Sequence, residues 1–217
     1  MHTAFSGLRS RIADWVRGQP NPDRLVALGL ELGSGAFISR TTYIDPGFPW
    51  LITIGDEATL APGVILLAHD ASMQRHARYT LIAPVVIGKR AFVGAGAIIL
   101  AGTQIGDNAI VGAGAVVSGE FPAGSVVAGN PARIIGDVES TSQRHRRAAS
   151  QAPRWPHQGW TLTHGITRER RVAQRRALPA GTVGYLELPG ALPATDGQAD
   201  SRCTGADSSP RGLSPIP

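Results

Sequence analysis

The middle of the chain repeats every six residues, and this period constrains the fold more than any other feature. From Ile87 the sequence divides into IGKRAF, VGAGAI, ILAGTQ, IGDNAI, VGAGAV and VSGEFP. The first position of each block is aliphatic, the second is Gly in four of the six blocks, and the fifth is Ala in four. The same frame occurs from Ile54 as IGDEAT, LAPGVI and LLAHDA, and more weakly from Leu32 as LGSGAF, ISRTTY and IDPGFP. Residues 50–53 and 72–86 interrupt the frame, so we expect insertions there.

A period of six matches neither the 3.6-residue period of a helix nor the two-residue period of a strand. It predicts a coil of short strands and turns, in which three blocks make one coil turn and the first-position aliphatic residue points inward. We expect the small fifth residue to let the chain pass the corner, and the Gly at the second position to adopt backbone conformations closed to other residues. Stacked turns then bury a continuous aliphatic column that a single turn could not bury alone. A flexible Gly-rich linker is excluded, because it would not place an aliphatic residue in register in nine blocks.

Composition divides the chain into three parts. Residues 1–31 are expected to form a helical segment, residues 32–137 the coil, and residues 138–217 a largely disordered tail rich in Arg, Pro and Gly. The helical expectation rests on apolar residues at three- and four-residue spacing, namely Phe5, Leu8, Ile12, Trp15 and Val16. Three aromatic residues in the tail are candidates for local docking, namely Trp155, Trp160 and Tyr185.

Charge, cysteine content and hydropathy limit the class of protein. The net charge of +5 comes entirely from residues 138–217, since residues 1–137 hold ten basic and ten acidic residues. Lys89 is the only Lys in the chain, so we interpret the Arg excess as gene composition and do not expect nucleic-acid binding. Cys203 is the only Cys, which excludes an internal disulfide and a Cys-rich zinc site. No run approaches the roughly 18 apolar residues of a membrane span, and the N-terminal residues lack the apolar core of a signal peptide, so we expect a soluble, cytoplasmic protein.

These repeats resemble those of the hexapeptide-repeat acyltransferases. The segments Ile54–Ser72 (IGDEATLAPGVILLAHDAS) and Ala128–Ile135 (AGNPARII) narrow the resemblance to the branch of maltose, galactoside and polysaccharide O-acetyltransferases. The resemblance implies an all-β core folded as a left-handed parallel β-helix. It also implies acetyl-CoA as co-substrate, a sugar or nucleotide-sugar hydroxyl as acceptor, no metal, and a homotrimer with sites between subunits.

His69 is the candidate general base of this chemistry. A neutral imidazole accepts a proton readily near working pH, and LAHDAS occupies the place of the base in the family that the chain resembles. The competing interpretation is a turn histidine with no catalytic task. Asp70 follows His69 directly, and neighbouring side chains of an extended chain point to opposite faces. We therefore expect Asp70 to contact the acceptor or to cap the loop, and not to orient the His69 ring. His76 in the insertion, and Asp45 and Trp50 before the second repeat segment, are further candidates for binding the acceptor.

The resemblance also assigns residues to the binding of CoA. Ala95, Ala113 and Ser118 correspond to small turn residues along which the pantetheine arm lies, although small residues are also required by a tight turn alone. Arg133 corresponds to the basic position that meets the CoA phosphates, for which the paired donors of Arg are well suited. Gly136 stands where related sequences have a second basic residue.

Two other functions remain open from the sequence. The first is a non-catalytic β-helix that serves as a scaffold for assembly. Such a protein needs the repeat but neither the LAHDAS nor the AGNPAR segment. A metal-dependent enzyme similar to the γ-class carbonic anhydrases needs about three protein ligands, whereas the coil contains only His69 and His76.

Overall fold

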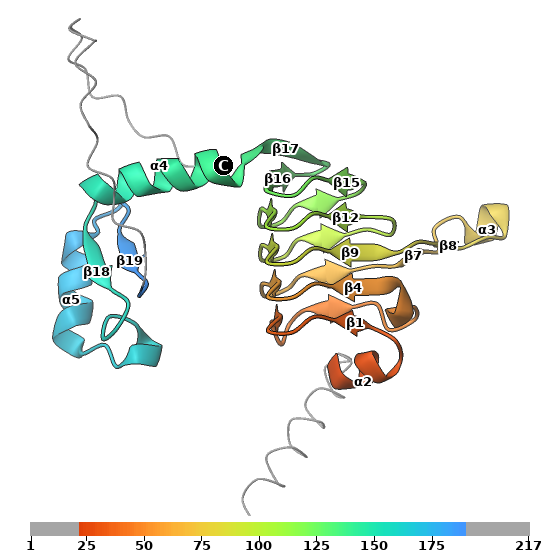
Figure 1. The fold of residues 1–217 in the computed structure, drawn as a ribbon, viewed down its shortest axis with the longest axis horizontal. Helices are drawn as coiled ribbons and strands as arrows, with labels where there is room; N and C mark the ends of the chain where they lie inside the picture. Colours follow the sequence, from red (N-terminus) through yellow and green to blue (C-terminus); the bar gives the residue numbers. More distant parts are fainter. Residues whose placement is uncertain (1–21, 190–217) are drawn as a thin grey trace, which may run out of the picture. The chain divides into compact units, whose positions relative to one another are not determined.

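The computed structural model describes residues 22–189, and its first compact unit is a coil of short strands stacked turn upon turn (Figure 1). Three sheets run along the coil, and their strands pair in parallel except at the last strand of one sheet. Sheet A contains β1 (Glu31–Leu32), β4 (Ile52–Ile54), β9 (Val85–Ile87), β12 (Gln104–Ile105) and β15 (Glu120–Phe121). Sheet B contains β2 (Phe37–Ile38), β5 (Thr59–Leu60), β10 (Phe92–Val93), β13 (Ile110–Val111), β16 (Ser125–Gly129) and the antiparallel β17 (Ala132–Asp137). Sheet C contains β3 (Tyr43–Ile44), β6 (Ile65–Leu66), β11 (Ile98–Ile99) and β14 (Val116–Val117). The expected fold class, a left-handed parallel β-helix, is confirmed.

Strand register confirms the length of one coil turn and the place of both insertions. Phe92 pairs with Ile110, 18 residues further along the chain. Tyr43 pairs with Ile65, 22 residues on, because the turn between them carries the extra residues that include η1 (Pro49–Leu51). Thr59 pairs with Phe92, 33 residues on, because that turn carries the second and larger insertion.

The aliphatic column predicted from the repeat forms the core. Its nine members in the two stronger repeat segments are at most 1% exposed: Ile54, Leu60, Leu66, Ile87, Val93, Ile99, Ile105, Val111 and Val117. The fifth-position residues Ala91, Ala97, Ala109 and Ala115 are equally buried, so they turn the corners without displacing this column. Burying each Val, Leu or Ile side chain contributes about 1.5–3 kcal/mol, and the column therefore carries much of the stability of the coil.

The glycine that follows the aliphatic residue is required for a different reason from the one the sequence suggested. Gly55 and Gly88 are not among the residues with positive φ. Instead, a Cβ at Gly55 would lie 2.7 Å from the backbone nitrogen of Lys89, and a Cβ at Gly88 would lie 2.6 Å from that of Asp107. Close approach of the next coil turn, rather than backbone freedom, therefore excludes a side chain at this position.

We expect Gly88→Ala to destabilise the coil by about 1–3 kcal/mol, because the backbone of the next turn must shift to admit the methyl group. The matched control is Gly136→Ala, since a Cβ at Gly136 meets nothing within 4 Å. Denaturant unfolding of both variants measures the difference. Equal stabilities would show that the close approach at Gly88 is not what selects glycine there.

The second compact unit begins within α4 (Val138–Gln151), at residue 144. It contains β18 (Arg154–Pro156), η2 (Leu162–His164), α5 (Arg168–Ala177) and β19 (Tyr185–Glu187), with β18 and β19 paired in parallel. Disorder was expected from residue 138 onward, but the structure differs over residues 138–189. The physical reason is local aromatic packing, because the Trp155 and Trp160 rings lie 5.9 Å apart and those of His145 and Tyr185 lie 6.1 Å apart.

The structure describes only part of the segment over residues 1–31 that was expected to be helical. The helix predicted over Phe5–Val16 lies outside the described residues, whereas α2 (Pro22–Ala27) begins at a proline and buries Leu25. Between residues 22 and 189, no helix has both the length and the apolar character needed to cross a lipid bilayer.

Candidate functional site

The candidate site lies at the corner where the chain leaves sheet C. Asp45 follows directly after β3, and His69 begins β7 (His69–Asp70), shortly after β6 in the next coil turn. Because β3 and β6 are paired, with Ile44 opposite Leu66, the two side chains come from neighbouring turns and meet at one edge of the coil.

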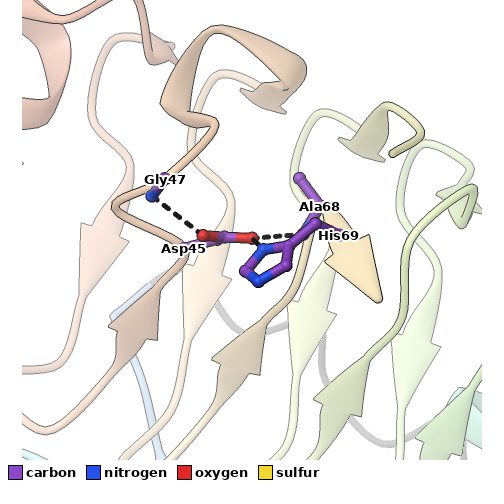
Figure 2. A network of polar contacts seen from close by, with 4 residues as sticks. All are labelled: Asp45, Gly47, Ala68 and His69. Carbon is purple, nitrogen blue, oxygen red and sulfur yellow. Dashed lines mark hydrogen bonds and ion pairs between the residues drawn. The ribbon is translucent and has the colours of Figure 1, made fainter. Parts of the chain in front are cut away.

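Asp45 is completely buried, and its carboxylate receives three donors (Figure 2). Oδ1 accepts a hydrogen bond from the backbone N–H of Gly47 at 2.9 Å, and Oδ2 accepts one from that of Ala68 at 3.0 Å. Oδ2 also contacts Nδ1 of His69. A buried carboxylate needs such partners, because an uncompensated charge is costly to remove from water. The two backbone donors therefore fix the carboxylate in place against the imidazole.

The Asp45 contact determines which nitrogen of His69 is available for chemistry. With Nδ1–H donated to the carboxylate, Nε2 carries the free lone pair and points away from Asp45 (Figure 2). The Phe48 ring lies 5.3 Å from the His69 ring and limits its rotation, while the side chain of His69 stays 35% exposed. An oriented, accessible and basic ring nitrogen is the arrangement that a general base requires.

An arm leaves the coil immediately after His69. β7 pairs with β8 (Leu81–Ile82) in an antiparallel hairpin, and the connecting residues contain the short helix α3 (Gln74–Ala77), which projects away from the stacked turns (Figure 1). Asp70 accepts a hydrogen bond from the backbone N–H of Ser72 at 2.8 Å, and this bond lowers the pKa of Asp70 below its usual value. Asp70 is thus an ionised cap of the arm and does not orient His69. His76 lies exposed in α3.

The aromatic residues of the first insertion extend the surface beside His69. Trp50 is 58% exposed and packs edge-on against Phe48, with ring centroids 5.6 Å apart. Phe48 therefore contacts both the Trp50 ring and the His69 ring. More than half of the Trp50 side chain is thus exposed near the base.

The residues expected to bind CoA occupy two corners and one end of the coil. Ala95 and Ala113 lie in successive turns at the corner between sheets B and C, where the N–H of Gly114 donates to the carbonyl of Ala95 at 2.9 Å. Ser118 lies between sheets C and A, at the same corner as His69. Arg133 is exposed on β17 at the end of the coil, and it donates to the carbonyl of Ala132.

No metal site accompanies these residues in the described part of the chain. Within residues 22–189, no group of three or more His, Cys, Asp or Glu side chains is placed to hold a metal ion.

Two residues of the site were not assigned their place by sequence reasoning. Asp45 was expected to contact the acceptor, but its carboxylate is buried against His69 and has no exposed surface to offer a ligand. The contact between the rings of Phe48 and His69 was not predicted either. The signal for Asp45 was available, since the repeat frame with its four-residue insertion places Asp45 directly beneath Leu67, two residues before His69.

The chain is similar in sequence to a described family and to several known proteins. Residues 84–118 match the family described as the hexapeptide repeat of succinyl-transferase. Nodulation protein L of Rhizobium leguminosarum bv. viciae is 42% identical over 134 residues, covering 52% of this chain and 68% of that protein. Protein CapG of Staphylococcus aureus is 36% identical over 123 residues, covering 54% of this chain and 72% of that protein. A hexapeptide-repeat acetyltransferase of known structure from Vibrio cholerae is 30% identical to this chain. The superposition has a TM-score of 0.47 and covers 51% of this chain and 63% of the acetyltransferase chain.

Proposed function

This chain belongs to the hexapeptide-repeat acetyltransferases, and from that premise we propose that it transfers an acetyl group from acetyl-CoA to a hydroxyl group of a small acceptor, with His69 as the general base. The single observation that carries the proposal is the geometry of His69. Its Nδ1 is held by the buried carboxylate of Asp45, and its Nε2 faces away from that carboxylate. A scaffold protein would not need a buried charge placed on an accessible imidazole.

The transfer requires one base and no covalent enzyme intermediate. As the acceptor oxygen attacks the thioester carbonyl carbon, its proton passes to Nε2 of His69. The C–O bond forms, the C–S bond then breaks, and the CoA sulfur leaves and takes the proton back from the imidazolium. The Asp45 carboxylate holds the ring in place and stabilises the positive charge that forms on it during the step.

Acetyl-CoA is the co-substrate of this proposal, and Ala95, Ala113, Ser118 and Arg133 are its proposed contacts. Small side chains at the two corners allow the pantetheine arm to approach the backbone. The exposed guanidinium of Arg133 suits the phosphates of the nucleotide end. A cytoplasmic setting is part of the proposal, because acetyl-CoA is a cytoplasmic metabolite.

A sugar or nucleotide-sugar is the acceptor that the surroundings of His69 favour. The apolar face of a sugar ring stacks on an aromatic side chain, and Trp50 offers an exposed indole that contacts Phe48 beside the base. Asp70 and His76, at the root and in the helix of the arm, are the proposed polar contacts of its hydroxyl groups.

A homotrimer is the proposed assembly, since two of the three outer faces of the coil are apolar. The outward residues of sheet A are mostly polar, namely Glu31, Thr53, Val86, Gln104 and Glu120. Those of sheets B and C are mostly apolar, namely Phe37, Thr59, Phe92, Ile110, Val126, Tyr43, Ile65, Ile98 and Val116. A contact between unlike faces of successive copies closes a ring, and sheet C ends at the corner that carries His69. The site then lies between subunits.

We expect Phe92→Asp to dissociate the trimer, because a carboxylate buried at the interface without a partner weakens assembly by about 10²-fold or more. The matched control is Gln104→Asp at the corresponding position of sheet A, which should leave the mass unchanged. Light scattering after size-exclusion chromatography gives the masses. A monomeric wild type, or a trimeric Phe92→Asp variant, would contradict the proposed interface.

Release of free CoA thiol against a panel of sugars and nucleotide-sugars tests the function itself. We expect saturable turnover with at least one acceptor, and mass spectrometry of that product should show one added acetyl group. Absence of both turnover and acetyl-CoA binding would favour the scaffold. Stoichiometric metal in the purified protein, together with activity that a chelator abolishes, would favour the metal-dependent alternative.

A further inference from the structure

The helix α5 of the second compact unit contains five arginines in ten residues, and all five are exposed. We call the side that carries Arg168, Arg171 and Arg175 the arginine face. Helical spacing places Arg168, Arg171 and Arg175 on a common side, and all three are exposed. Arg170 lies on another side of the helix and contacts the preceding loop. It lies over the Trp160 ring at 5.3 Å and donates from Nη1 to the carbonyl of Gly159 at 2.9 Å. By helical spacing, Arg168, Arg171 and Arg175 lie away from the side that contacts Trp160.

The described residues of the unit contain few acids to neutralise these arginines. Residues 144–189 hold nine Arg and two Glu. Glu187 forms an ion pair with Arg154 at 3.1 Å. Glu169 lies in the first turn of α5, where backbone N–H groups and Thr167 lower its pKa, with a smaller contribution from Arg171. The excess of positive charge is therefore local to this unit.

The use of Arg in place of Lys throughout the chain does not account for the excess of positive charge in the second unit. Residues 1–137 contain one Lys and nine Arg, yet their acidic residues balance this charge completely. A bias in gene composition changes which basic residue is used. It does not by itself gather unbalanced positive charge in one part of the chain.

We propose that the arginine face of α5 binds the phosphate backbone of nucleic acid. The Cβ atoms of helix residues three or four apart lie about 5–6 Å from one another. A nucleic-acid duplex carries a negative charge every ~1.7 Å of its axis, so each of the three arginines can reach a phosphate at the same time. Each Arg also matches a phosphate with two parallel donors. This binding is independent of acetyl transfer.

A lipid surface fits the helix less well than nucleic acid does. Helices that lie in a membrane interface oppose their basic face with large apolar side chains. In α5 the only large exposed apolar side chain is Val172, which lies among the arginines rather than opposite them. The helix therefore has charge to offer a polyanion and no apolar face to bury among acyl chains.

Fluorescence anisotropy of the full-length protein with a labelled DNA duplex of random sequence tests the proposal. The affinity should fall steeply with salt, with a slope of about −0.9 for each phosphate contact. The triple variant R168Q/R171Q/R175Q should reduce that slope by about three units and weaken binding at least about tenfold at low salt. The triple variant R168K/R171K/R175K should retain the slope, because it keeps the charges.

The matched control removes three exposed arginines of the first unit, Arg24, Arg40 and Arg90, as R24Q/R40Q/R90Q. It should bind the duplex as the wild type does, and so should His69→Ala. The proposal is overturned if the wild type fails to bind at low salt, or if the two glutamine triple variants lose binding equally. It is also overturned if anionic vesicles, acidic polysaccharide or polyglutamate are bound and the duplex is not.

Discussion

Replacing His69 by alanine lowers turnover by about 10²–10⁴-fold, the range expected when a general base is removed from a proton-transfer step. The loss appears in kcat, because the imidazole acts on the reacting hydroxyl and contributes little to ground-state binding. Thiol release from acetyl-CoA, measured with the acceptor found in the panel, gives the rate. Binding of acetyl-CoA, measured by calorimetry, should be retained.

Comparison of His69→Ala with His76→Ala tests whether His76, the other histidine near the site, acts as the base instead. His76 is exposed in α3, so its alanine variant should change the Michaelis constant for the acceptor more than it changes kcat. If turnover instead survives in His69→Ala and collapses in His76→Ala, the general base belongs to the arm. Circular dichroism of both variants separates loss of chemistry from loss of folding.

The coil was predictable because its signal is periodic. An aliphatic residue every six positions has only one consistent interpretation, and the buried column from Ile54 to Val117 follows it. Even the insertions were visible as breaks in the frame. The role of Gly88 was not predictable, because its reason lies in the backbone of Asp107 one turn away, which only the pairing of turns brings to 2.6 Å.

His69 was predicted from its motif, whereas its partner was not predicted, although the repeat frame carried the signal for it. Asp45 lies 24 residues before His69, and the two meet only when the coil register and the four-residue insertion are combined. The tail was expected to be largely disordered, and only local docking of Trp155, Trp160 and Tyr185 was anticipated; the ordered elements of residues 144–189 depend on isolated contacts such as that between Trp155 and Trp160. Contacts of that kind leave no period in a sequence.

Replacing Asp45 by asparagine should lower kcat by about 10²–10⁴-fold, as other oriented histidine bases lose activity when their carboxylate is neutralised. The amide has one acceptor oxygen, whereas the carboxylate now receives Gly47 N–H, Ala68 N–H and Nδ1–H of His69. An amide N–H turned toward His69 would favour the tautomer protonated on Nε2, which cannot accept a proton from the acceptor. A backbone donor left without an acceptor should also lower the free energy of unfolding by about 1–3 kcal/mol.

Nitrogen NMR of the imidazole distinguishes orientation from a merely structural role of Asp45. The wild type should show the tautomer protonated on Nδ1, and Asp45→Asn the one protonated on Nε2, at a temperature where both proteins are folded. The matched control is Asp70→Asn. This change neutralises a carboxylate that is next to His69 in the sequence but accepts its hydrogen bond from Ser72. That change should leave the tautomer as it is and act on the Michaelis constant for the acceptor. An unchanged tautomer in Asp45→Asn, with kcat retained, would mean that the buried carboxylate serves only to hold the corner of the coil together.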